Sequence, residues 1–120
     1  MTSAELKRRT EAFAFRLIRL VDKLPQGRSA DILGRQVLRS GTSVAANYRS
    51  ACRARSRREF IAKLGIVEEE VDETALWLKL ILRAGIAPDA ELLGLVKEAN
   101  ELTAITVASI KTARAKMGRK

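Results

Sequence analysis

The chain has 120 residues, of which 47% are hydrophobic and 31% charged, which predicts one folded domain over residues 1–120 and excludes a disordered chain. Its 23 Lys and Arg against 14 Asp and Glu leave a formal net charge of +9, which favours polyanionic partners such as nucleic acid. Charges interrupt the N-terminal segment and there is one cysteine, so the sequence predicts no signal peptide, no membrane span and a cytoplasmic location.

Apolar residues at alternating steps of three and four predict two amphipathic helices in the first half of the chain. The first helix is expected to end near Leu24, with the stripe Leu6, Thr10, Phe13, Leu17 and Leu20. The second begins at about Ser29, with the stripe Leu33, Val37, Gly41, Val44, Tyr48 and Ala51. The small residues Gly41 and Ala45 favour a close approach of a neighbouring helix.

A third helix is predicted from Ser56, because Ser56 and Glu59 have the spacing of a reciprocal capping box. Its stripe runs to Gly85 and Pro88, which stop the helix, through Phe60, Leu64, Val67, Val71, Thr74, Leu78 and Ile81. Asp89 is expected to cap a fourth helix, with the stripe Leu92, Val96, Ala99, Thr103, Thr106 and Ile110.

The fourth predicted helix has a wide apolar arc, because further apolar residues flank its stripe, namely Leu95, Leu102, Ile105 and Val107. We interpret this arc as a subunit interface; the alternative is a helix that is deeply buried within one bundle. Four helices with short connections predict an all-α, antiparallel up-down-up-down four-helix bundle.

The residue types needed for catalysis are scarce. The chain has no histidine and no phosphate-binding glycine loop, so we expect no enzyme activity and no cofactor. Acidic residues cluster in the third helix without ligands elsewhere to match, which indicates a solvated acidic face and no metal site. Ser40, Asn47 and Glu70 flank the core stripes and are expected to form a structural polar network, while Trp77 is expected to pack in the core.

An arginine-rich segment is the most informative feature. Between residues 35 and 58 there are seven arginines and no carboxylate. Those predicted to contact nucleic acid are Arg35, Arg39, Arg49, Arg53, Arg57 and Arg58. The first four lie opposite the core stripe, as an outward stripe about 27 Å long at roughly 1.5 Å per residue. Arginine binds phosphate in bidentate fashion, but acidic faces of the third helix could equally pair with this stripe between subunits.

The segment from Gln36 to Ile81 resembles the four-helix-bundle family of proteins encoded in intervening sequences of bacterial 23S rRNA genes. The motifs that carry the resemblance are Arg39-Ser40, Thr42-Ser43-Val44, Ala46-Asn47-Tyr48, Arg53-Ala54-Arg55-Ser56, Glu59-Phe60, Lys63-Leu64 and the run from Glu69 to Leu78. The resemblance implies a ring-like homopentamer without catalysis that associates with ribosomal RNA. It also implies kinship with accessory proteins of diversity-generating retroelements, which bind a reverse transcriptase and nucleic acid.

These observations give two hypotheses of different classes. The first is a non-enzymatic oligomeric scaffold that contacts RNA or DNA backbone through the arginine face. The second is a protein-protein interaction adaptor with no nucleic-acid role, in which the same arginines pair with acidic protein surfaces. Charge reversal at Arg49 and Arg53 is expected to weaken RNA binding in the first case and to dissociate the oligomer in the second.

Overall fold

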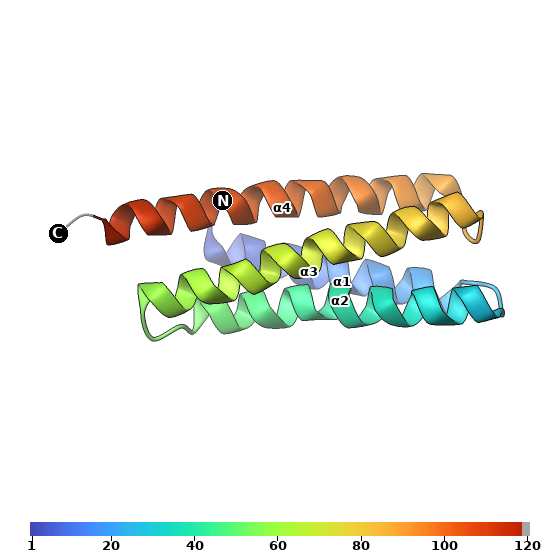
Figure 1. The fold of residues 1–120 in the computed structure, drawn as a ribbon, viewed down its shortest axis with the longest axis horizontal. Helices are drawn as coiled ribbons and strands as arrows, with labels where there is room; N and C mark the ends of the chain where they lie inside the picture. Colours follow the sequence, from blue (N-terminus) through green and yellow to red (C-terminus); the bar gives the residue numbers. More distant parts are fainter. Residues whose placement is uncertain (119–120) are drawn as a thin grey trace.

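The computed structural model describes residues 1–118 as four helices that run alternately up and down along one axis (Figure 1). The helices are α1 (Ser3–Asp22), α2 (Arg28–Cys52), α3 (Arg57–Ala84) and α4 (Asp89–Met117). The described residues include no strand, and the molecule measures 55 × 20 × 20 Å. The predicted antiparallel four-helix bundle is therefore confirmed.

Hydroxyl and carboxylate side chains close the first turns of α1 and α3. Thr2 and Glu5 form a complete capping box at α1, with each side chain accepting a hydrogen bond from the other residue's backbone N–H. At α3, Ser56 Oγ accepts from the Glu59 N–H at 3.0 Å, as predicted. The reciprocal bond is displaced by one residue, because the Glu59 carboxylate accepts from the Arg55 N–H at 3.4 Å.

The connection between α3 and α4 begins as predicted, at Gly85, but the predicted cap of α4 differs from the observed one. Gly85 ends α3 in the left-handed conformation at φ 67, which a glycine adopts without strain, and its N–H bonds to the Leu82 carbonyl. The prediction that Asp89 caps α4 is wrong, since Pro88 occupies the N-cap position and no side chain bonds to the first turn. Asp89 is already helical, and its carboxylate instead complements the positive end of the helix dipole.

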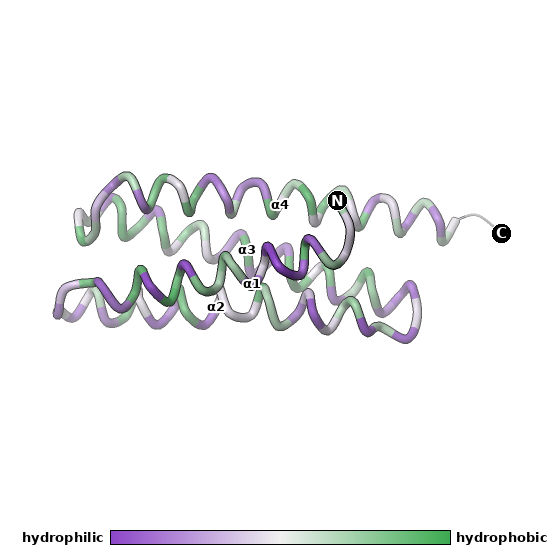
Figure 2. Tube along the Cα trace, turned by 180° about the vertical axis from the view of Figure 1, so that it is seen from behind, coloured by the Kyte–Doolittle hydropathy of each residue, from purple (hydrophilic) through white to green (hydrophobic). Residues whose placement is uncertain are grey.

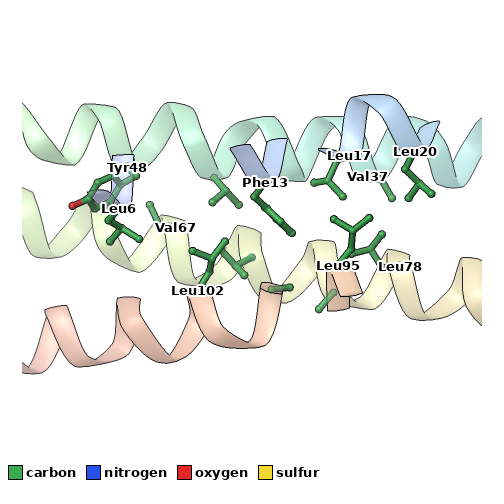
Figure 3. Packing of buried hydrophobic residues seen from close by; sticks show 14 of the residues in the cluster. Leu6, Phe13, Leu17, Leu20, Val37, Tyr48, Val67, Leu78, Leu95 and Leu102 are labelled. Carbon is green, nitrogen blue, oxygen red and sulfur yellow. The ribbon is translucent and has the colours of Figure 1, made fainter. Parts of the chain in front are cut away.

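The core runs along the bundle axis and receives large apolar side chains from every helix (Figure 3). The hydropathy pattern along the trace shows the same alternation of apolar and polar turns on all four helices (Figure 2). The predicted stripes of α1, α2 and α3 supply most of the fully buried side chains, which include Phe13, Leu17, Leu20, Val37, Val44, Leu64, Val67, Leu78 and Ile81. Burial of these stripes is what drives the four amphipathic helices together.

The core face of α4 is wider than the predicted stripe. Four residues of that stripe are buried as predicted, namely Leu92, Ala99, Thr106 and Ile110. Leu95 and Leu102 are at most 1% exposed and lie in the core, whereas Val96 and Thr103 of the predicted stripe are half-buried. The expectation that Leu95 and Leu102 belong to a subunit interface is therefore wrong. Their burial fits the alternative of a helix deeply buried within its own bundle, and half-buried Ile105 also packs against the core.

Helix α1 packs closely on α2 and is tied to α4 by charge. A Cβ atom at Gly41 would overlap Leu17 Cδ1, so the predicted close approach of α2 to a neighbour is confirmed. On the other side, Arg9 makes a bidentate pair with Glu98, with both N···O distances 2.7 Å. Within residues 1–118, no helix is long and apolar enough to cross a bilayer.

Candidate nucleic-acid interface

The six arginines predicted to contact nucleic acid are all exposed. Three project from the outer face of α2, one follows its last residue, and two begin α3. In order they are Arg35, Arg39, Arg49, Arg53, Arg57 and Arg58. The arginine-rich segment therefore runs along α2, through its connection to α3 and into the first turn of α3.

Arg39 is held by the acidic face of α3. Its guanidinium forms ion pairs with Glu73 and, at 3.4 Å, with Glu70, and its Nε donates to Gln36 Oε1 at 3.0 Å. The pairing of α2 arginines with α3 carboxylates, which the sequence led us to expect between subunits, thus occurs at this position within one subunit. Much of the Arg39 charge is therefore satisfied inside the bundle.

The remaining arginines differ in how they are paired. Arg49 lies 3.9 Å from Glu11 of α1, and both side chains are more than half exposed, so solvent weakens this pair. The other four have no ion-pair partner among the described residues, and these are Arg35, Arg53, Arg57 and Arg58. Within the predicted stripe, Arg39 and, more weakly, Arg49 are therefore paired with carboxylates. Arg35 and Arg53, at the two ends of the stripe, are not.

The larger of these ends is the connection between α2 and α3, which we call the arginine turn (residues 53–58). Four of its six residues are arginine, and all four are exposed. Arg53 closes the last turn of α2 with its backbone N–H, and Ser56 starts α3 three residues later. Two tight helix ends thus hold four guanidinium groups within a short span.

An exposed aromatic ring on α1, which the sequence analysis did not consider, extends the basic surface. Phe15 is 56% exposed, and the Arg19 guanidinium lies 5.7 Å from the centre of its ring. Phe15 is one helical turn from Glu11, the residue that pairs with Arg49, so the ring lies on the side of α1 next to α2. Its position off the α1 core stripe was the available signal in the sequence.

The polar residues between α2 and α3 form a smaller network than expected. Thr74 Oγ1 lies 2.7 Å from Ser40 Oγ and 2.7 Å from the Glu70 carbonyl oxygen, and both hydroxyl side chains are buried. Asn47 does not join this pair, because its amide donates to Ser43 within α2. The buried link between the two helices is therefore the Ser40–Thr74 hydroxyl pair, and the Glu70 carboxylate adds the more exposed ion pair with Arg39.

One carboxylate on the acidic side of α3, that of Glu73, makes contacts within the bundle, whereas Glu69 and Asp72 are exposed. Trp77 is half-buried against the core, and its indole N–H donates to Glu73 at 3.1 Å. Glu73 therefore accepts a hydrogen bond from Trp77 and forms an ion pair with Arg39. Among residues 1–118, no three histidine, cysteine or acidic side chains are grouped so that they could hold a metal ion.

Both the sequence and the fold are similar to those of known proteins. Residues 3–108 match the family model of the 23S rRNA-intervening sequence protein. A crystal structure from Bacteroides thetaiotaomicron, of a protein with unknown function from the S23 ribosomal protein family, is similar at 32% identity and a TM-score of 0.85. The match covers 92% of this chain and 99% of that one. No curated protein matches the sequence. The chain belongs to the 23S rRNA-intervening sequence protein family.

Proposed function

We propose that the protein is a non-enzymatic, oligomeric, cytoplasmic scaffold that contacts RNA or DNA backbone through the arginine turn and Arg35. The observation that carries this proposal is the set of four exposed arginines without an ion-pair partner among the described residues, Arg35, Arg53, Arg57 and Arg58. Phosphate oxygens are the natural ligands of such guanidinium groups, which bind them in bidentate fashion.

The electrostatics of the first turn of α3 support an anionic ligand. Arg57 and Arg58 lie at the positive end of the helix dipole, where a cation is unfavourable by about 0.3–1 kcal/mol. Neither residue gains an ion pair that would offset this cost within the described residues. A phosphate near this turn interacts favourably with both guanidinium groups and with the dipole, and these attractions oppose the repulsion from the Glu59 carboxylate in the same turn.

The type of contact follows from the side chains available. Guanidinium groups spread over an exposed surface neutralise phosphates and release counterions, which makes binding salt-dependent and largely independent of sequence. The family description refers to 23S rRNA, so ribosomal RNA is the first RNA to test. A reverse transcriptase is a further proposed partner, on the basis of the resemblance to retroelement accessory proteins.

Complementary outer faces support the proposed homo-oligomer. On α3, Ile66 and Leu76 are 40% and 49% exposed and alternate with the exposed carboxylate of Glu69. On the opposite side, Phe15 and Ile18 are exposed beside the basic face of α2. One face is apolar and acidic and the other apolar and basic, so copies of the chain can meet head to tail. Head-to-tail contacts close into a ring when the rotation between successive copies permits it, and we propose the pentamer that the family resemblance implies.

The second candidate function is a protein-interaction adaptor without a nucleic-acid role. The ion pairs of Arg39 with Glu73 and of Arg49 with Glu11 favour it, because they show that this surface accommodates carboxylate side chains. In this case the unneutralised arginines would bind an acidic partner protein or the acidic face of a neighbouring subunit.

Charge reversal with a matched control distinguishes the two functions. We would replace Arg35 and Arg53 with Glu, and in a control protein replace the exposed lysines Lys79 and Lys97 of α3 and α4 with Glu. Both proteins lose the same net charge, so a general electrostatic effect would be equal. The scaffold proposal predicts that only the arginine variant loses affinity for a 23S rRNA fragment while its mass in solution is unchanged. Equal RNA affinity of the two variants would refute the scaffold, and dissociation of the arginine variant would favour the adaptor.

A further inference from the structure

The bundle has an open end, because α1 is shorter than the helices around it. α1 has 20 residues whereas α4 has 29, and Figure 1 shows α4 continuing past the α2–α3 connection while α1 begins further in. A groove of about 890 Å³ lies at this end. Its walls are the last turns of α4, the α2–α3 connection and the first residues of α1. The groove thus lies beside the first turn of α1.

The floor of this end groove is apolar and its wall is made of small residues. Leu6, Tyr48, Phe60 and Ile105 contribute apolar surface from all four helices. The wall from α4 carries small side chains at helical spacing, Ala108, Ser109, Thr112 and Ala113. Small side chains on one helix allow another helix to approach closely, as Gly41 does elsewhere in this bundle.

The charge at the rim of the groove has one sign. Arg57 and Lys116 line it, and no carboxylate does. When a helix binds in a groove, its apolar face contacts the apolar floor and its charged residues contact charges of opposite sign at the rim. The lining of this groove therefore favours a helix with an apolar face and acidic residues beside it. The volume suits this occupant, since a cylinder of roughly 10 Å diameter and 5.4 Å per turn occupies about 420 Å³ per turn, or two turns in this groove.

We propose that the end groove binds an acidic amphipathic helix of a partner protein. Nucleic acid fits this site less well than the arginine turn, because the apolar floor offers nothing to phosphate. A second copy of this chain also fits less well. The inner stripe of its acidic helix α3 is buried in its own core, with Val67 and Val71. The outer face of α3, with Ile66 and Leu76, is the one that the proposed ring uses against another surface.

A selection experiment with groove-filling variants tests the proposal. The probe is a displayed library of amphipathic helical peptides with leucine fixed on one face and all other positions randomised. Peptides selected on the intact protein are then measured on Thr112→Trp, which fills the groove, on Lys116→Glu, and on Asn100→Trp. The last is the matched control, because Asn100 is exposed on α4 outside the groove. Circular dichroism establishes that each variant keeps its helices.

The expected result is that the selected peptides are acidic and bind T112W and K116E at least about tenfold more weakly than N100W. The proposal is overturned if no peptide is enriched, if the enriched peptides are basic, or if T112W binds them as N100W does. Two further outcomes also overturn it. A change of mass in solution confined to T112W would assign the groove to a second copy of the chain. A loss of RNA affinity confined to T112W would assign it to nucleic acid.

Discussion

Replacing Arg57 and Arg58 with Gln is expected to stabilise the fold and to weaken RNA binding at the same time. Both arginines are in the first turn of α3, beside the positive end of its dipole. Removing two cations from such a position is worth about 0.6–2 kcal/mol, and solvent screening of these exposed groups favours the lower half of that range. For a domain of this size, each kcal/mol raises the melting temperature by roughly 3–6 °C. Glutamine keeps the side-chain length and helix propensity, so few other terms change.

The binding half of this prediction has its own magnitude. If both guanidinium groups neutralise phosphates, the slope of log K against log salt falls by about 1.4 for single strands and 1.8 for duplex. Thermal unfolding at low and high salt gives the stability change, which is expected to fade at high salt because screening removes it. Fluorescence anisotropy with a labelled 23S rRNA fragment gives the slope.

The control for this prediction lies at the other end of the same helix. Arg83 is in the last turn of α3, where a cation is favourable, so Arg83→Gln is expected to lower stability slightly and to leave RNA binding unchanged. The reasoning is refuted if the Arg57 and Arg58 double variant binds RNA with the wild-type salt slope. It is equally refuted if the double variant is less stable than R83Q at low salt.

Three further predictions concern the bundle itself. Gly41→Ala should be less stable in urea unfolding than Gly65→Ala by at least about 1 kcal/mol. A Cβ at position 41 overlaps buried Leu17, whereas one at position 65 meets no atom within 4 Å, so equal stabilities would contradict this packing. Thr74→Val should cost about 1 kcal/mol by removing the buried hydroxyl pair with α2, which the same measurement checks, and an unchanged midpoint would show that the pair contributes nothing. Burial, together with a hydrogen bond to Cys52, raises the pKa of the Tyr48 hydroxyl above its ordinary value of about 10. The folded state therefore keeps this proton while the unfolded state loses it, so stability falls as pH rises beyond about 10 and should fall less steeply in Tyr48→Phe; identical alkaline profiles would count against this assignment.

The sequence was sufficient to predict the four helices, but not which face of α4 enters the core. In α4 the neighbouring residues Leu95 and Val96 are both apolar, so the apolar pattern alone does not show which of them is buried. Leu95 is the buried one, because of the way α4 packs on the other helices. The predicted N-cap of α4 was wrong for a related reason. Pro88 and Asp89 are both acceptable near a helix N-terminus, and only the backbone conformation shows that Pro88 is the N-cap.

The candidate site was predictable in its position and not in its pairing. The spacing of the arginines places them opposite the α2 core stripe, and all of them are exposed in the structure. Which charges are already neutralised depends on carboxylates of other helices, and Glu73 and Glu11 reach Arg39 and Arg49 only in the folded bundle. The unneutralised charge at the arginine turn is therefore a property of the tertiary structure.

The salt dependence of RNA binding by the wild-type protein is the most direct test of the proposed scaffold. We would measure the affinity for a 23S rRNA fragment at several salt concentrations, with the mass of the protein determined in the same buffers. The proposal predicts tight binding at low salt that falls steeply as salt rises, while the oligomer keeps its mass. A stable oligomer that does not bind the RNA at low salt would contradict it and leave the adaptor function.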